Sequence, residues 1–256
     1  MVKINIDPAE IAIFLSVLLR LSIIFFMLPL FRARNLPTNV KVCTIIALSF
    51  MLFPLIRQSI QPLPLNYPAQ VFEIVVGELV FGVVFSLSMR LVISAFQFAG
   101  ELISFEMGFG FSQASDPQTG AQNPVVSVWA ELLAMMILFS INGHHILLRL
   151  IIESFGNVPV GSFALDSGIF GKIILLAGKL FVLALKLSSP IIAVLMLTQL
   201  GLGLMSKFAP QINILTTSFP LTIAIGIFFL GLLTLVWGDL ARKSFAELFH
   251  FLGHLA

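Results

Sequence analysis

The sequence LSSPIIAVLMLTQLGLGLMS, residues Leu187–Ser206, contains no charged side chain. After Lys207 comes a second uncharged stretch, Phe208–Gly238, with the sequence FAPQINILTTSFPLTIAIGIFFLGLLTLVWG. A helix needs about 20 mostly apolar residues to cross the hydrocarbon core of a bilayer. Both stretches reach that length, so the sequence predicts apolar helices of membrane length in this part of the chain.

The composition of the whole chain points the same way. Of 256 residues, 59% are hydrophobic and 10% are charged, and the mean hydropathy is +1.08. Soluble domains average roughly 45–50% apolar and about 25% charged residues, so this composition excludes the soluble enzymes. The net charge of +2 gives no long-range field that would attract nucleic acid. The single cysteine, Cys43, cannot form an internal disulfide, and we expect it to be a small apolar core residue.

Hydrophobic residues gather in six blocks, followed by an amphipathic tail from Asp239 onward. The blocks are Ile11–Phe31, Val42–Ile56, Val71–Phe105, Val125–Ile152, Ile169–Met205 and Ile212–Trp237. We find no internal repeat and no low-complexity segment. The pattern predicts an all-α fold of hydrophobic helices with a central irregular loop, forming one domain over residues 1–256.

Ionisable residues interrupt several of these blocks. Each would cost about 2.5–3.5 kcal/mol on the insertion scale if it faced hydrocarbon. The acidic members of this set are Glu73, Glu78, Glu101, Glu106 and Glu131. Lys172, Lys179 and Lys186 recur every seven residues and therefore share one helix face, with a drift of about 20° per step. The carboxylates could form a proton relay, or they could pair with the lysine stripe within the chain or across a subunit contact; we favour pairing.

Aromatic usage is strongly uneven, with 26 Phe against two Trp and one Tyr. Trp and Tyr usually mark the membrane interface, whereas Phe has no polar group to place there. Together with the charges inside the blocks, this predicts helices that are buried largely against protein. We therefore expect the chain to belong to a multisubunit complex.

An irregular stretch, MGFGFSQASDPQTGAQNP over residues 107–124, joins the third and fourth blocks. Irregular backbone at membrane depth is tolerated only where it is buried in protein or lines a cavity. Large, deformable apolar residues at such a place suit a hydrophobic constriction that seals a pore by excluding water. An external connecting loop is the alternative. The candidate gate loop comprises Phe105, Met107, Gly108, Phe109, Gly110, Phe111, Ser112, Gln113, Ala114, Ser115, Asp116 and Pro117.

Motifs for catalysis or metal binding are incomplete. The stretch Gly110–Ala114 resembles a nucleophile elbow but lacks its second glycine. His250 and His254 are four residues apart without the Glu of the zinc-protease pattern, and we interpret them as solvated tail residues. We expect His144-His145 in a turn at the end of the fourth block, where histidines can satisfy terminal carbonyls. The sequence therefore predicts no enzymatic activity, no cofactor and no metal.

Short motifs that follow one another along nearly the whole chain resemble the FliR family, called SctT in virulence systems. They are Ala99-Gly-Glu-Leu-Ile103, Met107-Gly108, Phe111-Ser112, Asp116-Pro117, Pro124-Val125, Leu132-Leu133-Ala134, Asn142-Gly143-His144, Ser154-Phe155, Pro159-Val-Gly161, Ala209-Pro-Gln211, Phe219-Pro220 and Gly226. Each motif is weak alone, but their order is specific. His145 and the polar stretch Gln113–Ser115 look like local variation.

The resemblance implies a non-enzymatic subunit of the type III protein export apparatus. Proteins of this family join FliP-like and FliQ-like subunits in a closed helical export gate, with a FlhB-like protein alongside. Unfolded substrates would pass through its centre, driven by the proton-motive force and a cytoplasmic ATPase. The resemblance further implies helical hairpins that do not cross the bilayer as ordinary spans, a pore plug in the loop after the third block, and a place in the bacterial inner membrane within the flagellar basal body.

Two alternatives stay open at this point. A proton- or cation-coupled secondary transporter could use the buried carboxylates at broken helices. Such transporters usually show paired breaks in two related halves, whereas the breaks near Gly108–Pro124 and Ser206–Gln211 are dissimilar. Within the type III systems, a virulence-type export gate is the alternative to a flagellar one. An intramembrane enzyme is the remaining class.

Overall fold

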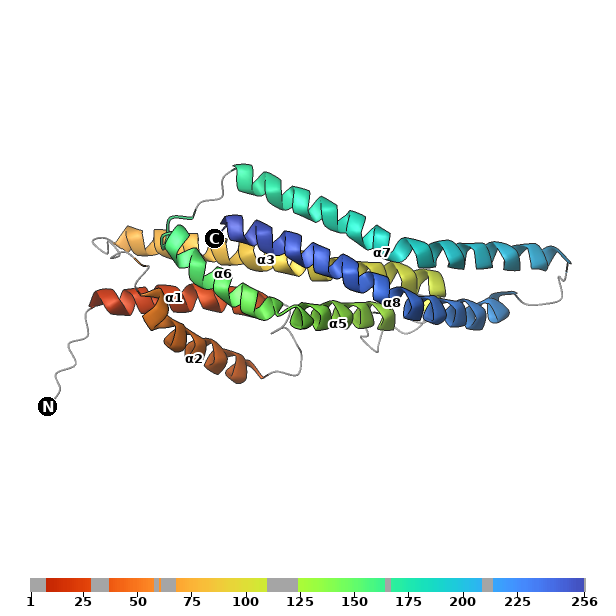
Figure 1. Ribbon diagram of the computed structural model, residues 1–256, viewed down its shortest axis with the longest axis horizontal. Coiled ribbons are helices and arrows are strands. Elements are labelled where there is room, and N and C mark those ends of the chain that lie inside the picture. The colour runs from red at the N-terminus through yellow and green to blue at the C-terminus, as the bar shows by residue number, and fades with distance from the viewer. Residues whose placement is uncertain are drawn as a thin grey trace. The chain divides into compact units, whose positions relative to one another are not determined.

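The computed structural model describes residues 8–28, 37–57, 60, 68–109, 124–163, 167–208 and 214–255. Across these ranges the ordered elements are helices, and none is a strand (Figure 1). The helices are α1 (Pro8–Met27), α2 (Thr38–Ile56), α3 (Pro68–Met107), α5 (Val125–Ser140), α6 (Gly143–Asn157), α7 (Ser167–Phe208) and α8 (Ile214–Leu255). The prediction of an all-α fold is confirmed.

Three of the helices are unusually long. Helices α3, α7 and α8 contain 40, 42 and 42 residues. Counted along the helix at 1.5 Å per residue, each amounts to about 60 Å, roughly twice the thickness of a bilayer's hydrocarbon core. In the described ranges, five helices are long and apolar enough to cross a membrane, or up to six if α5 and α6 count as one broken span.

The helix boundaries differ from the predicted blocks in two places. The fourth block is not one helix. Asn142 adopts a left-handed conformation with φ 55° at the N-cap position of α6, and α5 ends before it at Ser140. Asparagine tolerates this conformation better than most residues. His144 and His145 consequently lie in the first turn of α6 rather than in a turn at a helix end. The tail from Asp239 is likewise not separate, because it continues α8 to Leu255.

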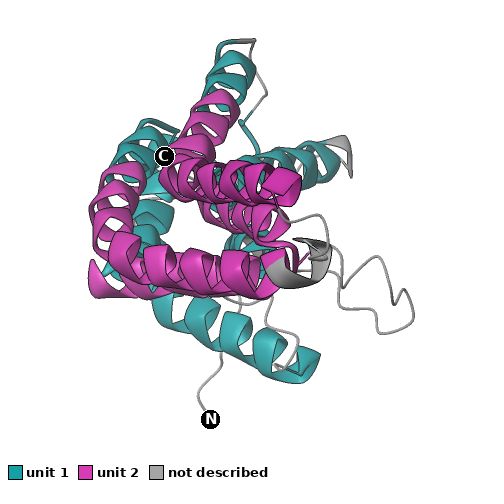
Figure 2. Ribbon diagram, turned by 90° about the vertical axis from the view of Figure 1, so that its right-hand side faces the viewer, with its two compact units in different colours: residues 1–91, 142–176, 246–256 teal, residues 92–141, 177–245 magenta. Residues whose placement is uncertain are grey.

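The chain divides into two compact units, shown in different colours in Figure 2. Unit 1 comprises residues 1–91, 142–176 and 246–256, and unit 2 comprises residues 92–141 and 177–245. Helices α3, α7 and α8 each contribute residues to both units. A single domain over residues 1–256 stays a prediction.

In unit 1, α1 and α2 form an antiparallel helical hairpin. Glu10 in the first turn of α1 approaches Arg57, the residue after α2, with 3.7 Å between Arg57 Nε and Glu10 Oε1. Between these ends, the rings of Phe14 and Phe53 meet edge to face with centroids 5.5 Å apart. Cys43 is exposed on α2, so the expectation of a buried cysteine is wrong. Its side of α2 also leaves Val42 and Ile46 exposed.

In unit 2, a buried tryptophan joins four helices. The indole of Trp237 on α8 donates to the carbonyl of Leu187 on α7 at 3.2 Å. Its ring lies 6.2 Å from Phe96 of α3 and 5.9 Å from Trp129 of α5, measured between centroids. Both tryptophans of the chain therefore contact each other in unit 2, where Trp237 is buried and Trp129 is 37% exposed.

Candidate functional site

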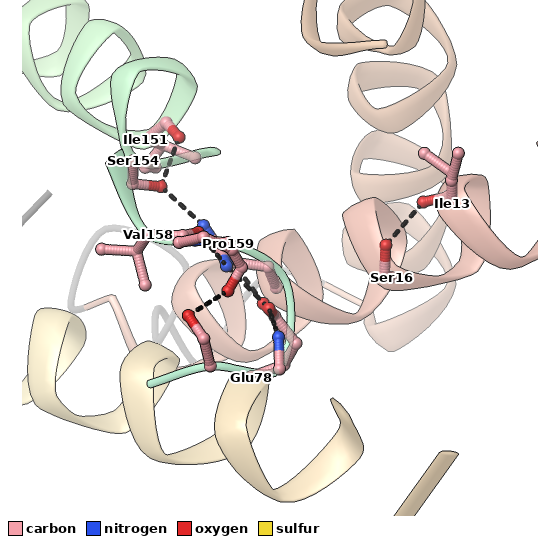
Figure 3. A network of polar contacts seen from close by, with 10 residues as sticks. Ile13, Ser16, Glu78, Ile151, Ser154, Val158 and Pro159 are labelled. Carbon is pink, nitrogen blue, oxygen red and sulfur yellow. Dashed lines mark hydrogen bonds and ion pairs between the residues drawn. The ribbon is translucent and has the colours of Figure 1, made fainter. Parts of the chain in front are cut away.

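A buried ion pair lies within unit 1. Arg20 of α1 and Glu78 of α3 form a two-pronged contact, with Nε 2.5 Å from Oε2 and Nη2 2.6 Å from Oε1 (Figure 3). The exposed fractions of the two side chains are 0% and 1%. Paired guanidinium and carboxylate groups in this arrangement are the strong, geometrically specific form of the interaction.

The remaining polar atoms of this pair also have partners. Arg20 Nη1 donates to the hydroxyl of Ser154 on α6 at 3.1 Å, and Nη2 approaches the carbonyl of Val158 at 3.3 Å. The backbone N–H of Gly161 donates to Glu78 Oε1 at 3.2 Å. We call Arg20, Glu78, Ser154, Val158 and Gly161 the charge network. It ties α1, α3, α6 and the turn after α6 together.

Two aromatic rings enclose the guanidinium of the charge network. The Arg20 Cζ atom lies 4.6 Å from the ring centroid of Phe81 and 4.1 Å from that of Phe155. A cation over an aromatic face is attracted by the ring's quadrupole, more strongly where water is excluded. The positive charge is therefore satisfied both in the plane of the guanidinium and along its faces.

Close backbone packing brings the turn after α6 to Glu78. A Cβ atom on Gly77 would lie 2.8 Å from the carbonyl oxygen of Gly161. A Cβ on Gly161 would lie 2.8 Å from Cα of Ile74, and the φ of Gly161 is +79°, a conformation that favours glycine. The two glycines let the turn rest directly on α3, which places the Gly161 N–H against the carboxylate.

Glu78 stands out in the sequence as a carboxylate within an apolar block, but the sequence pattern does not reveal its partner. The available signal was Arg20, a lone arginine inside the first apolar block. An ionisable residue within a membrane-length segment usually pairs with another. A sequence separation of 58 positions hid the pairing, because only the packing of α1 on α3 brings the two residues together.

The other predicted charges lie in different surroundings. Glu73 is exposed, and Glu131 is partly buried. The partly buried Glu101 accepts a hydrogen bond from Gln97 at 3.3 Å, and the partly buried Glu106 accepts one from Gln199 at 3.2 Å. All three residues of the stripe are exposed: Lys172, Lys179 and Lys186. Pairing of these lysines with carboxylates stays a prediction.

Part of the candidate gate loop falls within the described residues. Phe105 is 75% exposed, whereas Met107 is completely buried. Gly108 ends α3 with φ +91°, and Phe109 is partly buried. The structure therefore separates Phe105 from Met107, which the sequence analysis grouped together. The predicted loop residues Gly110, Phe111, Ser112, Gln113, Ala114, Ser115, Asp116 and Pro117 lie outside the described residues.

In each of the two histidine pairs the imidazole rings lie close together, but a pair supplies only two possible metal ligands. Ring centroids lie 4.1 Å apart for His144 and His145, and 4.5 Å apart for His250 and His254. Within the described ranges, no group of three or more His, Cys, Asp or Glu side chains is arranged to hold a metal ion.

Five helices long and apolar enough to cross a membrane, counted among the described residues, place the chain in the class of α-helical membrane proteins. Residues 11–248 match the family model described as "Bacterial export proteins, family 1". The chain belongs to this family of export proteins, the FliR family.

Several relatives carry the name "Flagellar biosynthetic protein FliR". The chain is 31% identical to the one from Bacillus subtilis, covering 89% of this chain and 86% of the relative. Identity to the relative from Pectobacterium carotovorum is 29%, over 89% of this chain and 86% of the relative. For the relative from Escherichia coli, identity is 27% over 93% of this chain and 90% of the relative.

Proposed function

We propose that this chain is a structural and gating subunit of the flagellar type III protein export channel, placed in the bacterial inner membrane. One observation carries the proposal: the export-family match extends over residues 11–248. The names of the relatives favour the flagellar system over the virulence system. The substrates would be unfolded proteins in transit, and the role requires no catalytic group or cofactor of this chain.

Assembly with other membrane subunits is part of the proposal. Large apolar side chains are exposed on several helices, including Phe50 on α2, Phe181 and Leu200 on α7, and Leu235 on α8. Exposed apolar surface of this extent marks contact with lipid or with protein. We propose FliP-like and FliQ-like subunits as the protein partners, with a FlhB-like protein alongside.

Within this assembly the candidate gate loop would seal the resting pore. The loop follows the end of α3, where the chain leaves a long apolar helix at Gly108. Large apolar side chains at a constriction exclude water and ions, and glycine allows backbone conformations that other residues rarely adopt. The loop could therefore block a narrow lumen and rearrange when a substrate arrives.

The described residues offer no observation that favours the transporter alternative. A coupling carboxylate must exchange protons or cations with water during its cycle. Glu78, the most deeply buried of the predicted carboxylates, is instead held by Arg20 and by the backbone of Gly161. This arrangement suits a fixed structural charge.

Deletion of Gly108–Phe111 tests the gating role. Cells expressing the deletion together with the partner subunits are assayed for permeability to ions and small solutes, and complex formation is measured in parallel. We expect an assembled complex that leaks. An assembled deletion complex as tight as the parent would return the segment to the status of a connecting loop.

A further inference from the structure

The last turn of α3, which leads into the candidate gate loop, is held by two other helices of unit 2. Gln199 on α7 has its Nε2 atom 3.2 Å from the carbonyl oxygen of Glu106 and 3.2 Å from its carboxylate. Thr222 on α8 has its hydroxyl 3.1 Å from the carbonyl oxygen of Met107. The last four carbonyls of a helix have no partner within it. Two of these four are therefore bonded by side chains of α7 and α8.

Close packing fixes the same turn sterically. A Cβ atom on Gly226 of α8 would lie 2.7 Å from three atoms of the Met107 side chain. A Cβ on Gly108 would lie 2.5 Å from the ring of Phe219. Met107 is completely buried. Helix α8 therefore packs closely against the final residue of α3 and against the glycine that follows it.

The start of α5, where the described chain resumes at Pro124, also packs on α3. A Cβ atom on Gly100 would lie 2.5 Å from Cα of Ser127, in the first turn of α5. Ser127 in turn bonds the carbonyl of Pro124, from its N–H at 3.0 Å and from its hydroxyl at 2.8 Å. Gly108 and Pro124, described residues on either side of residues 110–123, therefore belong to one packed region of unit 2.

We propose that Gln199, Thr222 and Gly226 form a clamp, the α3 clamp, that keeps the last turn of α3 in the same place in the closed and in the open gate. The inference rests on the gating role proposed above. The three are positioning residues, because they act on the gate through Glu106, Met107 and Gly108. Without the clamp, the end of α3 would be free to shift. The first residues of the candidate gate loop would then shift with it, away from the position in which the loop closes the pore.

The hydroxyl of Thr222 is the part of the clamp that can be tested most cleanly. Besides Met107, it lies near two carbonyls of its own helix, those of Ser218 at 3.0 Å and Phe219 at 3.1 Å. The single hydroxyl proton is shared among these three carbonyls. The two carbonyls of α8 lie within a helix, where backbone N–H groups also bond them. The Met107 carbonyl at the end of α3 has no such donor, so it loses most when the hydroxyl is removed. Thr234, also on α8, bonds its own helix, through the carbonyl of Leu230 at 2.9 Å. Thr234→Val is therefore a matched control for Thr222→Val.

The experiment compares Thr222→Val, Thr222→Ser and Thr234→Val in the full chain, expressed with its membrane partners. Ion and small-solute permeability is measured per assembled complex. We expect Thr222→Val to raise the leak on the order of 2- to 10-fold, the population change that one hydrogen bond supports. Thr222→Ser keeps the hydroxyl and should restore the parental value. A Thr222→Val complex as tight as the Thr234→Val complex would overturn the clamp.

A second measurement follows the position of α3 directly and does not depend on Thr222→Val assembling. In a Cys43→Ser background, the thiol of a Met107→Cys variant should react slowly with a small maleimide, because residue 107 is buried. Adding Gln199→Leu, a change at an exposed position, should speed the reaction several-fold, whereas adding Thr234→Val should not. Equal reaction rates in the two backgrounds would overturn the clamp.

The deletion of Gly108–Phe111 separates the two proposals. If the deletion leaks while Thr222→Val stays tight, the clamp is wrong and the gating role stands. If the complex assembled with the deletion variant does not leak, the gating role is wrong, and the proposed role of the α3 clamp in gating is wrong as well.

Discussion

Units 1 and 2 each hold a segment of α3 in place, but by different physical means. In unit 1, Glu78 is fixed by a buried ion pair with Arg20, and every hydrogen bond of the charge network includes a charged group. In unit 2, the end of α3 is fixed through its backbone carbonyls by Gln199 and Thr222, and by the fit of Gly226 to Met107. The first arrangement is strong and specific, whereas the second is built from individually weak contacts.

The difference shows what each region can tolerate. Removing one partner of a buried ion pair typically costs about 3–5 kcal/mol, because the other charge is left uncompensated. Losing one neutral hydrogen bond costs roughly 0.5–1.5 kcal/mol. Unit 1 should therefore fail as a whole when the charge network is broken. Unit 2 should lose the position of one helix end while the rest of its packing survives.

The largest effect is expected from Arg20→Met. This variant leaves the Glu78 carboxylate buried without its cation, so the complex should be destabilised by about 3–5 kcal/mol. The double variant Arg20→Met with Glu78→Leu removes both charges and should recover much of that loss. Thermal denaturation of the purified complex measures both. A double variant no more stable than Arg20→Met would show that the apolar packing around the guanidinium, not the charge pair, dominates.

A smaller effect is expected from Gly161→Ala. The substitution introduces a methyl group 2.8 Å from Cα of Ile74, in a conformation with φ +79°. Strain of this kind costs about 1–3 kcal/mol, and it would move the turn away from Glu78. Gly178→Ala is the control, since open space surrounds that position and alanine favours helix over glycine by about 1 kcal/mol. The melting temperature should fall for the first variant and stay level or rise for the second.

The smallest of these effects is expected at the lysine stripe. Exposed ion pairs contribute little, so Lys179→Met should assemble nearly as well as the parent. If the stripe faces carboxylates, Lys179→Glu adds like-charge repulsion and should lower the yield of assembled complex further. Co-purification with the partner subunits gives that yield. Equal yields from the two variants would indicate that Lys179 only extends its charged end into water.

Patterns along the chain predicted the all-α fold and its hydrophobic helices, because composition and apolar runs are local properties. The predicted fourth block runs through the break near Asn142, because the apolar pattern does not show the left-handed conformation of the residue that separates α5 from α6. The patterns also separated the polar tail from α8, although its charged residues are compatible with a continuous helix.

The candidate site was predictable only in part. Glu78 stood out as a carboxylate within an apolar segment, but its partner Arg20 lies on another helix. The α3 clamp left no signal at all, because Gln199 and Thr222 are ordinary polar residues in apolar helices. Their role follows from which carbonyls they reach, and that depends on tertiary packing.

The mass of the intact complex purified in mild detergent tests the central claim most directly. The account predicts that the chain is recovered in a discrete hetero-oligomer with two small hydrophobic partners. Expressed without those partners, the chain should be sensitive to protease. A monodisperse, protease-resistant monomer that purifies alone would contradict the assignment as an export-gate subunit.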